Sequence, residues 1–354
     1  MNSLPAGIRS RFVDDVNGLR THVLEAGQPG QPAVLLLHGF PELAYSWRKV
    51  MPALARAGFH VIAPDQRGYG ETTGWDDRYD TELKAFRVLN LVEDATQLVA
   101  RLALSQVHVV GHDFGSPVAA CCAILQRRVF RSVVLMSAPV GGVPVRNARV
   151  HEDLAALGRK HYQWYYSTRE ADANMRRAPQ GLAAFLRAYY HYKSADWQGN
   201  KPFPLKEWSA AELAKLPTYY VMELDRGMAE TVAPYAPASG SRWLTDADLA
   251  VYAQSFERTG FQGGLNWYRC ATSPEHTAAV GAALGGRTID VPSMFIAGAA
   301  DWGVHQKPGE FERMQKNVCT DFRGAHLVPG AGHWVQQEQP ERTAELLIDF
   351  LRAI

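Results

Sequence analysis

The sequence has no surplus of charge of either sign and no long apolar run. Lys and Arg total 37 against 36 Asp and Glu, so the formal charge is only +1 and nothing predicts nucleic-acid or anionic-membrane binding. No apolar stretch approaches the roughly 20 residues that span a bilayer, and the N-terminal residues lack the pattern of a signal peptide. These absences predict a soluble, cytoplasmic protein that binds neither nucleic acid nor membrane.

Cysteine is also scarce. The four cysteines follow no disulfide or metal-binding spacing, and no cluster of histidines has metal spacing either (Cys121, Cys122, Cys270, Cys319). Cys121 and Cys122 are adjacent in an apolar stretch, which is typical of buried, reduced thiols. We therefore expect no metal and no cofactor.

The apolar residues that are present form a repeating pattern. Short strand-like runs alternate with amphipathic helical stretches, and this alternation predicts a mostly parallel, twisted sheet with helices on both faces. Before the first such run, residues 11–26 alternate apolar and polar positions around Asn17-Gly18, which predicts an antiparallel hairpin. With 47% hydrophobic residues, the chain can bury a large core.

The alternation stops between about residues 141 and 286. This stretch lacks strand-like runs, is rich in Ala, Tyr, Trp, Arg and Leu, and is interrupted by prolines, so we expect a helical insertion. The predicted division is a core of residues 1–140 and 287–354 and a helical cap of residues 141–286. Within the cap, the segment 192–241 has no assigned role; shaping the site entrance and forming a homodimer contact are both open.

Gly111-His112-Asp113-Phe114-Gly115 follows the strand-like run 107–110 and has the small-x-nucleophile-x-small form of a nucleophile elbow. The two glycines remove the Cβ atoms that would clash where a strand turns sharply into a helix. Asp113 is thereby expected in a strained, exposed position at the end of the strand.

Two further polar residues follow later strands of the predicted sheet. Asp301 comes three residues after the run 293–298, and His333 ends a Gly-rich turn after the next strand. Taken singly, an Asp after a strand is more often a helix N-cap. Because the carboxyl ends of parallel strands share one edge, and because the order is nucleophile, acid and histidine, we predict that the two form a catalytic triad with Asp113.

Four motifs together resemble the α/β-hydrolases of the epoxide hydrolase branch, which are related to the haloalkane and fluoroacetate dehalogenases. They are His38-Gly39-Phe40-Pro41, Asp65-Gln66-Arg67-Gly68-Tyr69-Gly70, the elbow, and Gly330-Ala331-Gly332-His333. The resemblance implies an α/β-hydrolase fold with an inserted cap, and an oxyanion hole formed by the backbone N–H groups of Phe40 and Phe114.

An aspartate at the nucleophile position restricts the class of substrate that the site can use. A carboxylate that attacks an sp³ carbon forms an ester, which water can cleave at its carbonyl, whereas a serine would form an ether. Asp113 therefore predicts an epoxide or an alkyl halide as substrate, with His333 as the base that activates water and Asp301 as the group that orients it.

The leaving group separates the related families. Haloalkane dehalogenases usually carry Trp after the nucleophile and often Asn in the His-Gly-x-Pro turn, and fluoroacetate dehalogenases carry Arg after the nucleophile. Phe114 and Phe40 stand at these positions and have no side-chain donor. Epoxide hydrolases instead grip the epoxide oxygen with two cap tyrosines, and the matching residues are Tyr162, with Tyr165 and Tyr166 as rivals, and Tyr268.

We therefore predict an epoxide hydrolase that converts a small apolar epoxide and water into a vicinal diol. Five tryptophans near the motifs are candidates for the walls of the substrate pocket: Trp47, Trp164, Trp267, Trp302 and Trp334. A haloalkane or haloacid dehalogenase is the alternative enzyme, and a ligand-binding protein on a hydrolase core is the non-enzyme alternative.

Overall fold

The computed structural model describes residues 4–141, 149–238 and 240–354. Its centre is an eight-stranded sheet in the order β1-β2-β4-β3-β5-β6-β9-β10, in which β1–β2 and β2–β4 pair antiparallel and all other neighbours pair parallel. The mostly parallel sheet and the opening hairpin at Asn17-Gly18 are confirmed. The strands are β1 (Ile8–Val16), β2 (Leu19–Ala26), β3 (Ala33–Leu37), β4 (His60–Pro64), β5 (Val107–His112), β6 (Phe130–Met136), β9 (Ser293–Gly298) and β10 (Phe322–Val328).

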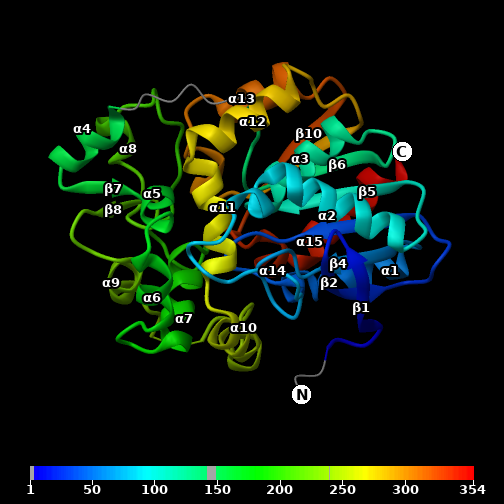
Figure 1. Cartoon of the computed structure of the whole chain (residues 1–354), viewed down its shortest axis with the longest axis horizontal. Coiled ribbons are helices and arrows are strands. Elements are labelled where there is room, and N and C mark those ends of the chain that lie inside the picture. Colours follow the sequence, from blue (N-terminus) through cyan, green and yellow to red (C-terminus); the bar gives the residue numbers. More distant parts are fainter. Residues whose placement is uncertain (1–3, 142–148, 239) are drawn as a thin grey trace.

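Helices cover both faces of this sheet (Figure 1). They are α1 (Met51–Arg56), α2 (Val88–Arg101), α3 (Gly115–Leu125), α13 (Glu310–Arg313), α14 (Val335–Glu338) and α15 (Pro340–Arg352), with short turns η1 (Ala44–Trp47), η2 (Leu83–Phe86), η4 (Trp302–Val304) and η5 (Met314–Val318). No helix in the described ranges is long and apolar enough to cross a membrane.

Strand alternation divides the buried residues into two clusters, one on each face. Val110 of β5 belongs to the cluster under α1 and α15, whereas its neighbour Val109 belongs to the cluster under α2 and α3. Only the second cluster continues into the insertion, where it includes Tyr166 and Leu265. The inserted residues therefore share a core with one face of the sheet.

The insertion between β6 and β9 is largely helical, as expected. It contains α4 (Val150–Ala156), β7 (Arg159–His161), α5 (Tyr162–Tyr166), α6 (Glu170–Arg176), α7 (Leu182–Tyr192), α8 (Ala210–Leu213), β8 (Val221–Glu223), α9 (Met228–Val232), η3 (Ala233–Tyr235), α10 (Asp246–Thr259), α11 (Gln262–Thr272) and α12 (Pro274–Leu284). Figure 1 shows α4 to α9 grouped beside the sheet, with α11 between this group and the core helices. The division at residues 141 and 286 stays a prediction.

One expectation about the insertion is wrong, because it does contain strands. β7 and β8 pair antiparallel, with Arg159 opposite Glu223 and His161 opposite Val221. At three residues each, these strands are too short to produce a detectable alternation in the sequence. They bring the start of α5 next to the segment 192–241.

Hydrogen bonds join the insertion to the core at several points. The Tyr190 hydroxyl donates to the Pro41 carbonyl at 2.6 Å, and Trp334 Nε1 donates to the Tyr190 carbonyl at 2.9 Å. The buried Arg48 pairs with Asp248 of α10 at 2.9 Å. These contacts hold the cap over the carboxyl ends of the central strands.

The elbow glycines are required by close backbone approach. A Cβ atom at Gly111 would lie 2.1 Å from the Gly115 carbonyl oxygen, and one at Gly115 would lie 2.4 Å from the Leu37 carbonyl oxygen. No side chain can move to relieve either contact, because the obstructing atoms belong to the backbone.

We expect Gly111→Ala to lower the free energy of unfolding by about 1–3 kcal/mol, the usual cost of overpacking a rigid site. Denaturant unfolding measures this loss. The matched control is Gly240→Ala, whose new Cβ would have no neighbour nearer than 3.8 Å. Equal stability of the two variants would contradict this account of the elbow.

Candidate functional site

Asp113 lies at the end of β5 in the left-handed backbone region, with a φ of 52°, and its side chain is buried. Its Oδ1 accepts the Phe40 backbone N–H at 2.9 Å, and its Oδ2 lies 3.2 Å from His333 Nε2. The Phe40 turn can approach this closely because residue 39 is glycine. A Cβ atom at that position would lie only 2.4 Å from the Asp113 Cβ. The two carboxylate oxygens are thus held by different groups.

His333 lies between Asp113 and Asp301. His333 Nδ1 is 3.1 and 3.2 Å from the two Asp301 oxygens, and Asp301 Oδ1 also accepts the Gly303 N–H at 2.7 Å. The sheet order explains the meeting, since β5, β6, β9 and β10 are consecutive parallel neighbours whose carboxyl ends share one edge. The structure brings the three predicted triad residues together.

The electrostatics of the site keep its carboxylates charged. Burial alone would raise the pKa of Asp113, but the hydrogen bond and charge of His333, helped by Lys193 and His112, bring that pKa below its usual range. The pKa of Asp301 is lowered in the same way, because His333 outweighs the effect of burial. The Asp113 side chain is therefore ionised at neutral pH.

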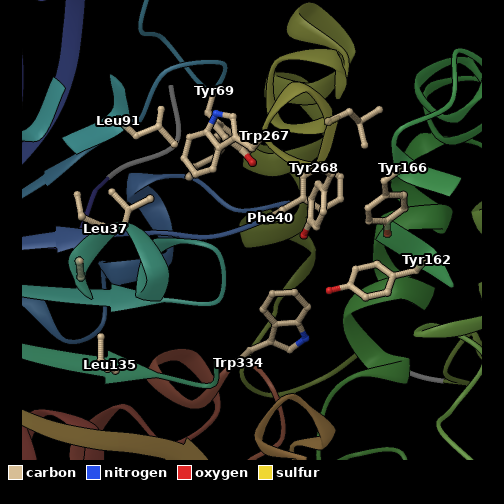
Figure 2. Close-up of a cluster of buried hydrophobic side chains, with 14 of the residues drawn as sticks. Leu37, Phe40, Tyr69, Leu91, Leu135, Tyr162, Tyr166, Trp267, Tyr268 and Trp334 are labelled. Carbon is tan, nitrogen blue, oxygen red and sulfur yellow. The ribbon is translucent and has the colours of Figure 1, made fainter. Parts of the chain in front are cut away.

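Tyr162 and Tyr268 come from different cap helices, α5 and α11, and their ring centroids are 5.9 Å apart. Figure 2 shows both hydroxyls pointing into the region between Phe40 and Trp334. Burial, followed by the charge of Asp113, raises the pKa of each phenol well above its usual range. Both tyrosines therefore retain the protons that they would donate.

The rivals of Tyr162 point elsewhere or have another partner. The Tyr165 ring lies against Lys160, whose Nζ is 4.7 Å from the ring centroid. The Tyr166 ring is close to Phe40 and Tyr268, but its hydroxyl donates to the Tyr189 hydroxyl at 3.1 Å. The Tyr162 hydroxyl also has partners, since it donates to Gln306 Oε1 at 3.4 Å and accepts from Gln163 Nε2 at 3.2 Å. Tyr162 differs from Tyr166 in that neither partner is another tyrosine.

The two predicted oxyanion donors differ in their present bonding. Phe40 N–H donates to Asp113, whereas Phe114 N–H has no hydrogen-bond acceptor among the described residues. The Phe114 ring packs edge-on against Tyr268 and Trp267, at centroid distances of 5.1 and 5.2 Å. An N–H group directly after the nucleophile is thus available to an oxyanion.

A histidine–glutamate pair behind the triad has no clear signal in the sequence. His112 Nε2 donates to the His333 carbonyl at 2.7 Å, and His112 Nδ1 donates to Glu42 at 2.6 Å. Burial opposes a charge on His112, but Glu42 outweighs it and raises the pKa. Glu42 and His112 are 70 residues apart, so only the fold reveals that an imidazolium braces the backbone of His333.

The cap braces the same histidine from the other side. The His333 backbone N–H donates to the Lys193 carbonyl at 2.9 Å. The partly buried carboxyl group of Glu338 accepts the N–H groups of Gly332, Trp334 and Ala195 at 2.8–2.9 Å. The loop that carries the base is therefore fastened to the residues that follow α7.

The segment 192–241 also supports Tyr162. The Tyr220 carbonyl accepts the Tyr162 backbone N–H at 2.9 Å, and the two ring centroids are 5.1 Å apart. Neither Tyr220 nor Lys193 belongs to a motif, so the sequence offered no means of placing them in the site.

The five tryptophans divide into two groups. Trp334 packs on His333 with ring centroids 4.7 Å apart, Trp267 packs on Phe114, and Trp302 directly follows Asp301. Trp47 instead lies in the core cluster under α1 and α15, on the face away from the cap, and Trp164 stacks on His151 at 3.7 Å. The expectation that all five line the site is corrected, since helical spacing alone does not say which face of the sheet a side chain covers.

Comparison with known proteins agrees with this geometry. A family model described as the alpha/beta hydrolase fold matches residues 32–340. Epoxide hydrolase A of Mycobacterium tuberculosis is 34% identical over 345 residues, which is 96% of each chain, and epoxide hydrolase B of the same organism is 34% identical over 94% of this chain and 96% of its own length.

Solved structures agree as well. An epoxide hydrolase from an endophytic Streptomyces is 32% identical with a TM-score of 0.82, over 98% of this chain and 96% of its own. Epoxide hydrolase A from Mycobacterium thermoresistibile is 33% identical with a TM-score of 0.79, over 98% of each chain. The chain belongs to the epoxide hydrolase family of the α/β-hydrolase fold.

Proposed function

We propose that this protein opens an epoxide to a vicinal diol through a covalent ester on Asp113. The observation that carries the proposal is the division of labour between the two oxygens of the Asp113 carboxylate. Oδ1 is held by the Phe40 N–H, and Oδ2 lies on the His333 side at 3.2 Å. Oδ2 is therefore the attacking atom, and Oδ1 becomes the ester carbonyl oxygen.

In the first half-reaction Oδ2 attacks an epoxide carbon and the carbon–oxygen bond of the ring breaks. The negative charge moves from the carboxylate to the former epoxide oxygen, which takes a proton or a strong hydrogen bond from Tyr162 and Tyr268. Both phenols are protonated, because burial and the charge of Asp113 raise the pKa of each. General acids of this kind contribute about 10²–10⁴-fold to rate.

In the second half-reaction His333 removes a proton from water, which attacks the carbonyl carbon of the Asp113 ester. Asp301 stabilises the imidazolium that forms. The Phe40 and Phe114 N–H groups stabilise the tetrahedral oxyanion at Oδ1, and removing one such donor costs about 3–4 kcal/mol in comparable sites. The tetrahedral intermediate then collapses, the bond between the acyl carbon and Oδ2 breaks, and the departing alkoxide takes the proton from His333. The alkyl–oxygen bond stays intact, so the diol keeps the Asp113 oxygen and the enzyme keeps the oxygen of water.

The side chains at the two positions that distinguish the dehalogenases do not favour halide chemistry. A departing halide needs N–H donors, yet the side chains of Phe40 and Phe114 are hydrocarbon and pack against Tyr268.

The homodimer and the cytoplasmic location stay predictions.

A single turnover of styrene oxide by excess enzyme in ¹⁸O-water should place the label in Asp113, because water attacks the ester carbonyl. Mass spectrometry of the peptide that contains Asp113 measures this. Label found only in the diol would rule out the covalent route, and halide release from haloalkanes or haloacids at a comparable rate would support a dehalogenase instead.

Tyr162→Phe and Tyr268→Phe should each lower kcat/KM for styrene oxide by about 10- to 100-fold, since each removes one of two acids. Tyr165→Phe is the matched control and should behave like the wild type, because its ring lies against Lys160. A larger loss in Tyr166→Phe than in Tyr162→Phe would assign the first acid to Tyr166.

A further inference from the structure

Lys193 is a buried basic side chain beside the catalytic groups. It directly follows α7, and only 3% of its surface is exposed. Lysine is almost never fully buried unless its charge is paired. Among residues 4–141, 149–238 and 240–354, however, no carboxylate lies within ion-pair distance of Lys193 Nζ and no acceptor forms a hydrogen bond with it.

Four aromatic rings surround the ammonium group instead. Nζ lies 5.1 Å from the ring centroid of Tyr220, 5.3 Å from Trp334, 5.4 Å from Tyr189 and 5.8 Å from Tyr219. Such cation–π contacts stabilise a desolvated charge. They leave the three N–H donors of the ammonium group unused.

The backbone on both sides of Lys193 is anchored. Asn200 Nδ2 donates to the carbonyls of Tyr192 and Ser194 at 2.9 and 2.7 Å, and the Tyr219 hydroxyl donates to Asn200 Oδ1 at 2.8 Å. The Lys193 carbonyl itself accepts the His333 N–H. The backbone that carries the Lys193 side chain is therefore fixed in position.

Two of the rings that surround the ammonium group also contact catalytic residues. The Trp334 ring packs on His333 with centroids 4.7 Å apart, and the Tyr220 ring packs on Tyr162 with centroids 5.1 Å apart. Figure 2 shows the hydroxyl of Tyr162 directed toward the space between Phe40 and Trp334. Lys193 therefore lies beside this space.

The site's own carboxylates do not use the donors of Lys193. Asp113 is bound by Phe40 and His333, and Asp301 is bound by His333 and Gly303. Burial lowers the pKa of Lys193, and the charges of Asp113, Asp301 and Glu42 act against that lowering from a distance. An oxyanion brought by a ligand would fill the unused donors and pair the charge.

We propose, on the basis of the proposed function, that Lys193 binds the carboxylate of the substrate and that the enzyme favours short-chain epoxy acids over neutral epoxides of the same shape. The rings of Tyr219, Tyr220 and Trp334 enclose the alkyl chain and exclude water. Asp113 then attacks the epoxide at the other end of the same short molecule.

The test compares 4,5-epoxypentanoate with 1,2-epoxy-5-methylhexane, in which an isopropyl group replaces the carboxylate. Homologues that are one carbon shorter and one carbon longer test other distances between the carboxylate and the epoxide. The wild type should show the higher kcat/KM for the acid at one of these lengths. Lys193→Met should lower the ratio of kcat/KM for acid to neutral epoxide by about 10- to 100-fold, the usual effect of losing a charge-assisted hydrogen bond.

Lys160→Met is the matched control, because Lys160 also lies over a cap tyrosine but faces Tyr165. It should leave the ratio unchanged. A fall in both rates with an unchanged ratio in Lys193→Met would show that Lys193 only tunes the catalytic carboxylates, and would overturn the proposal. Turnover of neutral epoxides with no acid preference in the wild type would overturn this inference alone, whereas no epoxide turnover at all would overturn the proposed function with it.

A measurement on the unaltered enzyme keeps the proposal testable if Lys193→Met does not fold. Pentanoate should inhibit hydrolysis of the neutral epoxide competitively, and at least 10-fold more strongly than pentanamide. Equal inhibition by the two compounds would overturn the carboxylate site.

Discussion

The contact between Asp113 and His333 is the interaction on which the rest of this structure depends. A carboxylate enclosed by protein would normally take up a proton, because burial penalises its charge. His333 Nε2 at one oxygen and the Phe40 N–H at the other reverse that effect and keep Asp113 ionised. Since Asp113 and His333 are 220 residues apart in sequence, both the sheet and the loops must be held rigidly for this contact to exist.

The supports of His333 explain why so much buried polar structure surrounds the site. His112 and Glu42 hold its carbonyl from the core, while Lys193 and Glu338 hold its loop from the cap side. An imidazole that contacts a carboxylate through each of its two nitrogens needs a fixed ring position. Residues of both the core and the cap therefore position the imidazole of His333. The cap not only covers the site but also fixes one of its side chains.

The cap also gives the site its chemical character. Tyr162 and Tyr268 supply hydroxyl groups to an otherwise aromatic surface, and Tyr220 holds Tyr162 from behind. Lys193 adds a basic side chain with which none of the described carboxylates pairs directly. The core thus contributes Asp113, Asp301 and His333, while the cap contributes the tyrosine hydroxyls and this lysine.

The sequence by itself determined the sheet, the elbow and the triad, because each rests on a local pattern: unbroken apolar strands, glycines that clear a turn, and polar residues at strand ends. Tertiary structure alone decided which tryptophans reach the site, that β7 and β8 pair, and that Lys193, Tyr220, Glu42 and Glu338 belong to it. These residues act through contacts between segments far apart in the chain. No local periodicity predicts such contacts, because they form only when segments far apart in the sequence pack together.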